Sequence, residues 1–297
     1  MSGPAGGATF RQRAFVALQH PLPQHFLSRL VYHATRSTWR PWKNLLIRRF
    51  LRGFRVDMSE AAQPDPFAYP TFNAFFTRAL RPDARPIHSN ARALVCPVDG
   101  TVSQAGHIDD RELFQAKGHH FSLGALLAGE RTLVEKFRHG EFATIYLAPH
   151  NYHRVHMPLA GVLNATLHVP GRLFSVNAAT AAQVPGLFAR NERVICTFDT
   201  PQGSLAMILV GALFVGSMST IWAGEITPAS RGRPALLPAP APPVRLAAGA
   251  EMGRFNMGST VIVLLERGRV RWLDSLRAGA SVRLGERIGI CDEVASK

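Results

Sequence analysis

The sequence has little cysteine and almost no lysine. Its three cysteines, Cys96, Cys196 and Cys291, are isolated and include no C-x-x-C pair. An odd number of scattered cysteines is typical of a reducing compartment, and it argues against both a disulfide framework and a cysteine zinc site. Lysine occurs only at positions 43, 117, 136 and 297, so nearly all of the positive charge is carried by arginine.

The beginning of the sequence lacks the pattern of a secretion signal. The first 26 residues, MSGPAGGATFRQRAFVALQHPLPQHF, contain no continuous apolar segment followed by a small-residue cleavage site. We therefore expect no signal peptide.

A single long uncharged run, LAMILVGALFVGSMSTIWAG at 205–224, must be weighed as a membrane span. Twenty residues are enough to cross a bilayer as a helix. However, glycine, serine and threonine interrupt the run, and no basic cluster lies at its start. Two buried strands joined at Gly211 and Gly216 fit this pattern better than a transmembrane helix.

Acidic residues are scarce relative to basic ones. The chain of 297 residues has 34 lysines and arginines against 20 aspartates and glutamates, a formal net charge of +14. Such an excess predicts attraction to an anionic partner, either nucleic acid or a phospholipid surface. An apolar share of 46% with 21 prolines indicates a globular fold with many turns, arranged as one large domain or two small ones.

The stretch from residue 10 to residue 60 has a helical pattern that mixes aromatic and aliphatic residues with arginine. Pro41 is expected to divide it into two helices. A basic amphipathic helix with tryptophan, here Trp39 and Trp42, at its apolar margin is typical of a helix lying in a lipid interface. A surface helix packed on its own domain explains the pattern equally well. Nucleic-acid binding is a third interpretation, which no recognition motif supports.

The remainder of the chain predicts a short helix and then mostly strands. YPTFNAFFTRALRP, at 69–82, favours a helix with Thr71 as its N-cap, ended by Pro82. From about residue 92, β-rich runs alternate with Gly, Pro and Asn turns. The fold class expected is therefore α+β, with N-terminal amphipathic helices (1–60) followed by a β-rich catalytic core (61–297). The proline-rich segment 228–247 predicts an exposed, mobile loop.

Three groups of residues are able to carry chemistry. Asp99 lies in CPVDGTV, a common turn sequence. The motif HNYHRVHMP brings His153 and His156 to a spacing of three, which places them on one face if the segment is helical and suits a zinc site, but no further ligand matches that spacing. Ser259 follows Gly258 just before the strand-like run TVIVLL. Aspartate, histidine and serine in this order form one of the known catalytic triad orders, although each residue alone is equally consistent with a turn or with packing.

The blocks quoted so far, together with others, resemble bacterial phosphatidylserine decarboxylase along nearly the whole chain. The matching blocks are VDMSEA, TFNAFFTRALRP, PVDGTVSQAG, FQAKGHHFSLGALLAG, YHRVHMP, VPGRLFSVN, LFARNERVICTFDT, VGALFVGSMSTIWAG and EMGRFNMGSTVI. YHRVHMP and the Gly-Ser-Thr of the last block are the most specific. The departures are Met257 where leucine is commonest, the APHNYH loop and the proline-rich segment.

The resemblance implies a pyruvoyl-dependent enzyme that makes its own cofactor. Asp99, His156 and Ser259 correspond to a self-processing triad that cleaves the Gly258–Ser259 bond, giving chains 1–258 and 259–297 and a pyruvoyl group at position 259. That group forms a Schiff base with the amine of phosphatidylserine. His153 corresponds to the residue of the decarboxylation step. Pyridoxal phosphate is not expected, since no lysine lies in a motif for it, and no metal is expected.

The resemblance also implies partners and a location. The substrate is phosphatidylserine in an anionic membrane, the processed short chain stays bound, and protomers are expected to form a homo-oligomer without nucleic acid. Peripheral attachment to the cytoplasmic face of a bacterial inner membrane follows. Two alternatives stay open: a membrane-associated serine hydrolase using Asp99, His156 and Ser259 without self-cleavage, and a non-enzymatic basic membrane-binding protein.

Overall fold

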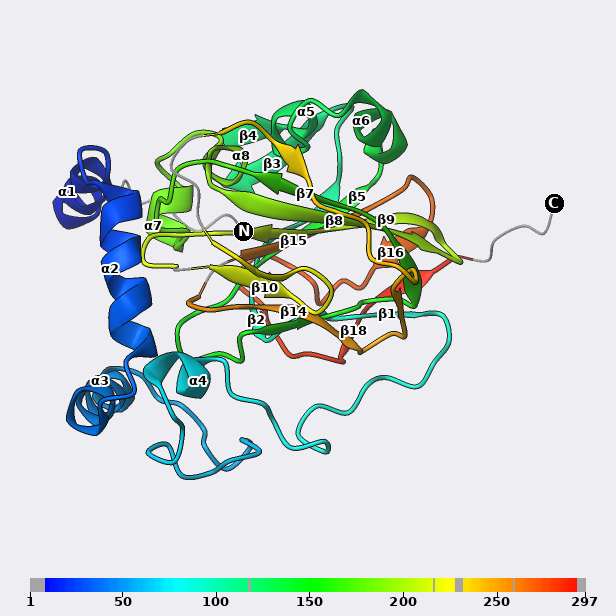
Figure 1. The fold of residues 1–297 in the computed structure, drawn as a ribbon. Coiled ribbons are helices and arrows are strands. Elements are labelled where there is room, and N and C mark those ends of the chain that lie inside the picture. Colours follow the sequence, from blue (N-terminus) through cyan, green and yellow to red (C-terminus); the bar gives the residue numbers. More distant parts are fainter. Residues whose placement is uncertain (1–8, 117–118, 216, 228–231, 259, 293–297) are drawn as a thin grey trace.

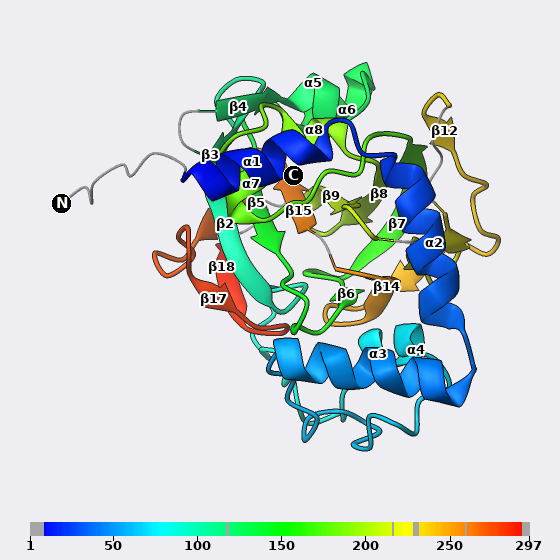
Figure 2. The ribbon, with the colours of Figure 1, turned by 90° about the vertical axis from the view of Figure 1, so that its left-hand side faces the viewer.

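Helices precede a β-rich core, as the α+β prediction requires (Figure 1). The computed structural model describes residues 9–116, 119–215, 217–227, 232–258 and 260–292. The first three helices are α1 (Phe10–Gln19), α2 (Gln24–Arg36) and α3 (Arg40–Gly53). Figure 2, which faces these helices, shows all three on one side of the molecule.

The number of N-terminal helices differs from the two that were expected. A break does occur beside Pro41, as expected: residues 37–39 separate α2 from α3, and Pro41 lies in the first turn of α3, where a backbone N–H group would have no intrahelical partner. A further break around Pro21 and Pro23 separates α1 from α2. Helical structure ends at Gly53 rather than near residue 60.

The predicted helix with Thr71 as its N-cap is α4 (Phe72–Phe76), and Thr71 accepts a hydrogen bond from the Ala74 N–H group. The helix ends well before Pro82, since the Thr77 side chain and the Arg78 N–H group bond to carbonyls of its last turn. Its phenylalanines form a small core with Ile47 of α3, so α4 joins the N-terminal helices to the rest of the molecule.

The main sheet has nine strands in the order β12-β7-β8-β9-β15-β5-β2-β17, with β13 also paired to β7. All its neighbours are antiparallel. The strands are β2 (Gly100–His107), β5 (Glu141–Tyr146), β7 (Gly161–Val169), β8 (Arg193–Thr200), β9 (Gly203–Val210), β12 (Ala235–Leu236), β13 (Arg245–Leu246), β15 (Thr260–Leu265) and β17 (Ser281–Val282).

Three smaller sheets and four short helices complete the described fold. A four-stranded sheet has the order β11-β10-β14-β6, a three-stranded sheet has the order β1-β18-β16, and β3 pairs with β4. Their bounds are β1 (Ala93–Val95), β3 (Glu112–Ala116), β4 (His119–Ser122), β6 (Arg154–His156), β10 (Met218–Thr220), β11 (Gly224–Ile226), β14 (Glu251–Phe255), β16 (Val270–Trp272), β18 (Arg287–Cys291), α5 (Leu123–Leu126), α6 (Arg131–Phe137), α7 (Ala178–Ala181) and α8 (Leu187–Arg190).

Strand β15, which directly follows position 259, is the most buried part of the sheet. It lies between β9 and β5, and all six of its residues are buried. Val261 and Val263 pack into one hydrophobic cluster and Ile262 and Leu264 into another, because alternate side chains point to opposite faces of a strand. Each such side chain contributes about 1.5–3 kcal/mol when fully buried, so this segment is firmly held.

The uncharged run at 205–224 is not a transmembrane helix. It contains most of β9 and all of β10, as two strands, which confirms the interpretation of buried strands. In the described parts of the chain, no helix has both the length and the apolar character that a membrane span needs.

The proline-rich segment is not a free loop. Residues 228–231 lie outside the described residues, but beyond them β12 and β13 pair with the edge strand β7. The Leu237 N–H group also bonds to the Thr166 carbonyl at 2.8 Å. The segment therefore satisfies backbone groups along an edge that would otherwise stay unpaired. Most of its described residues are exposed, as predicted, but two short strands stand where a loop was expected.

Candidate active site

His153 is enclosed completely and is fixed in one orientation. Its ring stacks on Phe76 of α4, with centroids 4.1 Å apart and planes at 19°. Its Nε2 atom lies 3.2 Å from the Pro149 carbonyl oxygen. A carbonyl oxygen only accepts, so Nε2 carries the hydrogen and Nδ1 carries the lone pair. Burial lowers the pKa of His153 to about 3, so the ring is neutral.

The free nitrogen of His153 faces the neighbourhood of Gly258. Nδ1 is buried and has no hydrogen-bond partner among the described residues. A Cβ atom placed on Gly258 would lie 3.1 Å from His153 Cε1 and 3.8 Å from Nδ1. Because Gly258 has no side chain, the backbone at this position can approach the imidazole closely, which is a recognised use of glycine.

A cavity of about 310 Å³ reaches Gly258. Its lining is largely apolar and includes Gly258, Met257, Phe76, Phe50, Phe54 and Phe214. Phe50 and Phe54 belong to α3 or the residue after it, so the N-terminal helices form one wall. The candidate site therefore opens beside helices that the sequence predicted to contact lipid.

His156 is held in the opposite tautomer. Its Nδ1 atom lies 2.8 Å from the Gly249 carbonyl oxygen and therefore carries the hydrogen, while Nε2 lies 3.2 Å from the Tyr152 hydroxyl and accepts from it. Burial lowers the pKa of His156, and burial raises the pKa of Tyr152. His156 is thus a neutral base whose lone pair is on Nε2.

The Asp99 carboxylate is hydrogen-bonded to Arg85 and not to His156 among the described residues. Arg85 donates to both carboxylate oxygens at 2.6–3.1 Å, and the Leu284 N–H group donates to Oδ1 at 2.9 Å. Burial opposes the charge on Arg85, but its hydrogen bonds to Asp99 and Glu60 outweigh this and raise its pKa. No hydrogen bond joins Asp99 to His156 among the described residues. The Asp99 charge nevertheless favours protonation of His156.

The three members of the predicted triad are therefore not shown to meet. Ser259 lies outside the described residues, Asp99 is bound to Arg85, and His156 is bound to Gly249 and Tyr152. The structure brings together His153 and Gly258 instead.

The helical interpretation of the histidine motif is wrong. His153 precedes strand β6 and His156 ends it, so the chain is extended where a zinc pair on one helical face was considered. No group of three or more potential metal ligands occurs in the described part of the chain.

Sequence reasoning missed a buried cation, Arg78, and its surroundings. The residue is 4% exposed, and its Nε and Nη1 atoms have no partner among the described residues. Burial lowers its pKa. Arg78 lines a polar cavity of about 290 Å³ together with Asp99, Arg85, Glu60, Tyr152 and His150. The only signal was an arginine following the phenylalanines of FNAFFTR, a pattern that a surface helix shares.

Sequence reasoning also missed the polar contacts that hold the chain before Gly258. Asn256 is buried, and its side-chain amide lies 2.7 Å from Ser217 Oγ, 3.0 Å from Ser219 Oγ and 3.2 Å from Glu225 Oε1. Arg36 of α2 forms an ion pair with the same Glu225 carboxylate. A line of polar contacts therefore runs from α2 to the residues beside the candidate site.

Known proteins match the chain over almost its full length. The family model described as phosphatidylserine decarboxylase matches residues 72–290, and a model described as PSD matches residues 14–55. The phosphatidylserine decarboxylase proenzyme of Bordetella bronchiseptica is 53% identical over 283 residues, which cover 95% of each chain. The proenzyme of Methylococcus capsulatus is 52% identical over 280 residues, 94% of this chain and 97% of that protein. That of Alkalilimnicola ehrlichii is 57% identical over 251 residues, 84% and 86% of the two chains. These matches show that the chain belongs to the phosphatidylserine decarboxylase family and is a decarboxylase.

Proposed function

We propose that the chain converts phosphatidylserine to phosphatidylethanolamine and CO2, using a pyruvoyl group made from its own Ser259. The observation that carries this proposal is the buried Nδ1 atom of His153, which has no partner among the described residues and lies beside Gly258 at the end of a largely apolar cavity. A pyruvoyl group supplies a ketone that accepts the electrons released when CO2 leaves. The neighbouring residues fit such a group, since they offer a proton-transfer atom in a site with little water.

Self-processing requires a base for Ser259. In the proposed step the Ser259 hydroxyl takes the place of Tyr152 at His156 Nε2, gives up its proton there and attacks the Gly258 carbonyl carbon. The bond between the Gly258 carbonyl carbon and the amide nitrogen then breaks, the nitrogen takes the proton from His156, and an ester to the serine oxygen remains. In the elimination, His156, now neutral again, takes the serine Cα proton, the Cβ–Oγ bond breaks, and Gly258 keeps a carboxylate. Hydrolysis of the remaining dehydroalanine releases ammonia and leaves the ketone.

Support for His156 as this base comes from its tautomer. The Gly249 carbonyl holds the Nδ1–H group, as a carboxylate does in a serine protease triad, and leaves Nε2 basic. Asp99 contributes through its charge, which favours the protonated ring. After cleavage, chain 259–297 stays bound because its first strand, β15, pairs with β9 and β5.

His153 performs a different proton transfer in this proposal. Phosphatidylserine arrives with a protonated amine, which must lose a proton before it reacts with a ketone. Nδ1 of the neutral His153 accepts a hydrogen bond from that ammonium group and relays its proton to the α-carbon after CO2 leaves, without storing it, because burial lowers the pKa of the ring to about 3. The apolar cavity keeps water from competing for the carbanion.

The proposed location is the cytoplasmic face of a bacterial inner membrane, with the enzyme bound peripherally. The helical side of the molecule exposes large apolar residues among its arginines, which suits a lipid interface. They are Phe10, Phe15, Leu18, Phe26, Leu30, Trp39, Leu45 and Phe54. The proposed assembly of processed protomers is a homo-oligomer, and no nucleic-acid partner is proposed.

Mass spectrometry of the purified protein tests self-processing. We expect two chains divided at Gly258–Ser259, with a pyruvoyl group on the smaller one. An intact chain with an ordinary Ser259 that hydrolyses lipid esters would instead establish the serine hydrolase alternative. An intact chain that binds lipid without turnover would establish the non-enzymatic one.

Three variants test the division of labour between residues. Ser259→Ala and His156→Ala are expected to leave one uncut chain. His153→Ala is expected to cleave but to release no CO2 from phosphatidylserine. Normal CO2 release by His153→Ala would show that the roles of the two histidines are assigned wrongly.

A further inference from the structure

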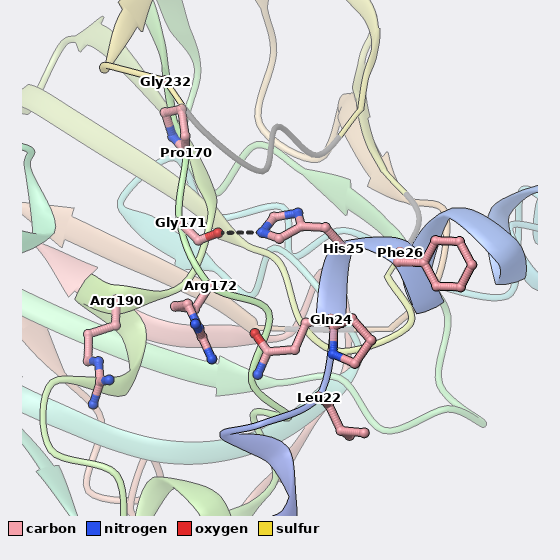
Figure 3. Close-up of a pocket in the computed structure, with 10 residues that line it drawn as sticks. Leu22, Gln24, His25, Phe26, Pro170, Gly171, Arg172, Arg190 and Gly232 are labelled. Carbon is pink, nitrogen blue, oxygen red and sulfur yellow. Dashed lines mark hydrogen bonds between the residues drawn. The ribbon is translucent and has the colours of Figure 1, made fainter.

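We propose that the cavity between the start of α2 and residues Pro170–Arg172 binds the phosphate of an anionic membrane phospholipid, at a position separate from the reaction cavity. Binding of a lipid phosphate here does not depend on the proposed function. Only its effect on the decarboxylation of phosphatidylserine rests on that function. The cavity measures about 480 Å³ and includes Leu22, His25, Phe26, Pro170, Arg172 and Arg190 in its lining. Figure 3 shows the lining residues, with Arg172 and Arg190 contributed by the body of the protein, Phe26 by α2 and Leu22 by the turn before it.

The guanidinium groups of two arginines that line this cavity both lie close to the ring of Phe174. The Cζ atoms of Arg172 and Arg190 lie 5.3 and 5.2 Å from the centre of the Phe174 ring. Neither arginine forms an ion pair with any carboxylate of the described residues, although Arg172 donates to the His20 carbonyl at 2.9 Å. Both positive charges therefore lie within reach of one cavity, and a bound anion would neutralise them. Paired arginines suit phosphate, since their fork of donors matches its oxygens.

The wall facing α2 is fixed by a hydrogen bond. His25 of α2 and the Gly171 carbonyl oxygen are joined at 3.0 Å (Figure 3). Gln24, which is buried, accepts from the Leu173 N–H group at 2.9 Å and donates to the Gln19 carbonyl at 2.8 Å. These contacts tie the 170–173 segment to α2, so the cavity is a defined feature of the fold.

The surroundings of the cavity favour a lipid phosphate over a free phosphate ion. Phe26, in its lining, is 59% exposed, and Leu30, one turn further along α2, is 52% exposed. On α1, Leu18 is 66% exposed. Arginines set among protruding apolar side chains match the depth of phosphate groups in a bilayer, with the apolar side chains entering the acyl region. A free phosphate ion gains nothing from such neighbours.

One segment connects this cavity to the reaction cavity. Arg172 lines the proposed phosphate cavity, while Ser175 and Val176 line the cavity that ends at Gly258. Three residues of chain span at most about 10 Å, so the linings of the two cavities lie close together. A phospholipid held at Arg172 therefore places the reaction cavity against the membrane, where it meets its substrate.

Vesicle binding of the processed enzyme tests the proposal. The test variant is Arg172→Gln/Arg190→Gln. The matched control is Arg267→Gln/Arg277→Gln, which removes the same charge at two arginines that form no ion pair among the described residues and lie outside the cavity. Vesicles of phosphatidylcholine alone are compared with vesicles that also contain phosphatidylglycerol, an anionic lipid without an amine. Arg172→Lys/Arg190→Lys keeps the charge, and thermal melting checks that each variant is folded.

We expect the wild type and the control variant to bind the phosphatidylglycerol vesicles equally well. The glutamine test variant should bind them roughly tenfold or more weakly, and the lysine variant should recover part of the loss. Phosphatidylglycerol should also lower the KM for phosphatidylserine in vesicles for the wild type and not for the glutamine test variant. Inorganic phosphate at millimolar concentration should not displace the wild type.

Two results would overturn the proposal. Equal vesicle binding by the glutamine test variant and the control variant would show that the two arginines contribute only general charge. Displacement of the wild type by inorganic phosphate would assign the cavity to a free anion. If the wild type releases no CO2 from phosphatidylserine, the proposed function fails. The vesicle-binding comparison still decides whether the cavity binds a lipid phosphate.

Discussion

The side-chain amide of Asn73 donates a hydrogen bond of 2.6 Å to the backbone carbonyl of Asn256, two residues before Gly258. Asn73 belongs to α4, whose Phe76 stacks on His153. One short helix thus positions both the imidazole and the chain that approaches it. The Asn256 side chain is held from the other side by serines and Glu225, so the backbone before the proposed cleavage bond has little freedom to move.

Replacement of Asn256 by alanine is expected to slow self-cleavage. The change leaves the buried Ser217 hydroxyl and the Glu225 carboxylate without their amide donor, and it frees the segment before Gly258. We expect a loss of about 1–3 kcal/mol in unfolding free energy and at least a roughly tenfold slower cleavage, a barrier change of about 1.4 kcal/mol. A time course on denaturing gels measures the cleavage. Asn164→Ala, at an exposed asparagine with a 3.4 Å contact to Asp199, is the control. Cleavage at the wild-type rate with a lowered Tm would assign Asn256 a purely structural role.

Gly258→Ala is expected to impair cleavage through crowding. The new methyl group would lie 3.1 Å from His153 Cε1 and 3.4 Å from the Leu147 carbonyl oxygen, closer to the ring than most side chains approach. The ring cannot retreat easily, because Phe76 stacks on its face. We expect mostly uncut chain by mass spectrometry. Gly53→Ala, where a Cβ meets nothing within 4 Å, should cleave normally. Full cleavage of Gly258→Ala would show that His153 does not restrict this position.

Acid is expected to destabilise the protein partly through its two buried histidines. Burial lowers the pKa of His153 from 6.5 to about 3 and also lowers that of His156. At a pH between the pKa of an unfolded histidine, about 6.5, and the lower pKa in the folded protein, the unfolded chain binds protons that the folded protein does not. The free energy of unfolding therefore falls as the pH falls below about 6.5. His153 contributes a slope of about 1.4 kcal/mol per pH unit between its unfolded and folded pKa values, and His156 adds to it in the same direction. Urea unfolding of Ser259→Ala from pH 7 to pH 4 measures it. Adding His153→Phe should flatten the slope, and an unchanged slope would contradict the burial effect.

Arg85→Met is expected to be strongly destabilising. The side chains of Arg85 and Asp99 are both 8% exposed, so removal of the arginine leaves a buried carboxylate whose remaining partner is the Leu284 N–H group. Breaking such a pair costs about 3–5 kcal/mol. Chemical unfolding in a Ser259→Ala background, which keeps one chain, measures the loss. Asp99→Asn added to Arg85→Met should restore part of it.

The matched control for the buried pair is Arg111→Met. Arg111 pairs with Glu135 at the surface, where the side chains are 50% and 57% exposed. Loss of an exposed pair costs about 0–1 kcal/mol. Equal effects of the two arginine variants would mean that burial does not strengthen the Arg85–Asp99 pair.

Local features of the fold were predictable from the sequence because they depend on neighbours in the chain. Thr71 caps α4 by bonding to Ala74, three residues away. The run TVIVLL after position 259 forms β15, as its consecutive β-branched and apolar residues predict. The break beside Pro41 was predicted correctly, because proline is tolerated in the first turn of a helix and disfavoured within one. The separate helix α1 was not predicted.

By itself, the amino-acid sequence determined the family and the α+β class, because motifs and periodicity are written in consecutive positions. Only the tertiary structure decided which groups meet. Arg85 binds Asp99, the Gly249 carbonyl binds His156, and His153 lies against Gly258. The last two partnerships join residues about a hundred positions apart. Hydrogen bonds and packing across such separations depend on how sheets and helices assemble, and no local pattern in the chain encodes them.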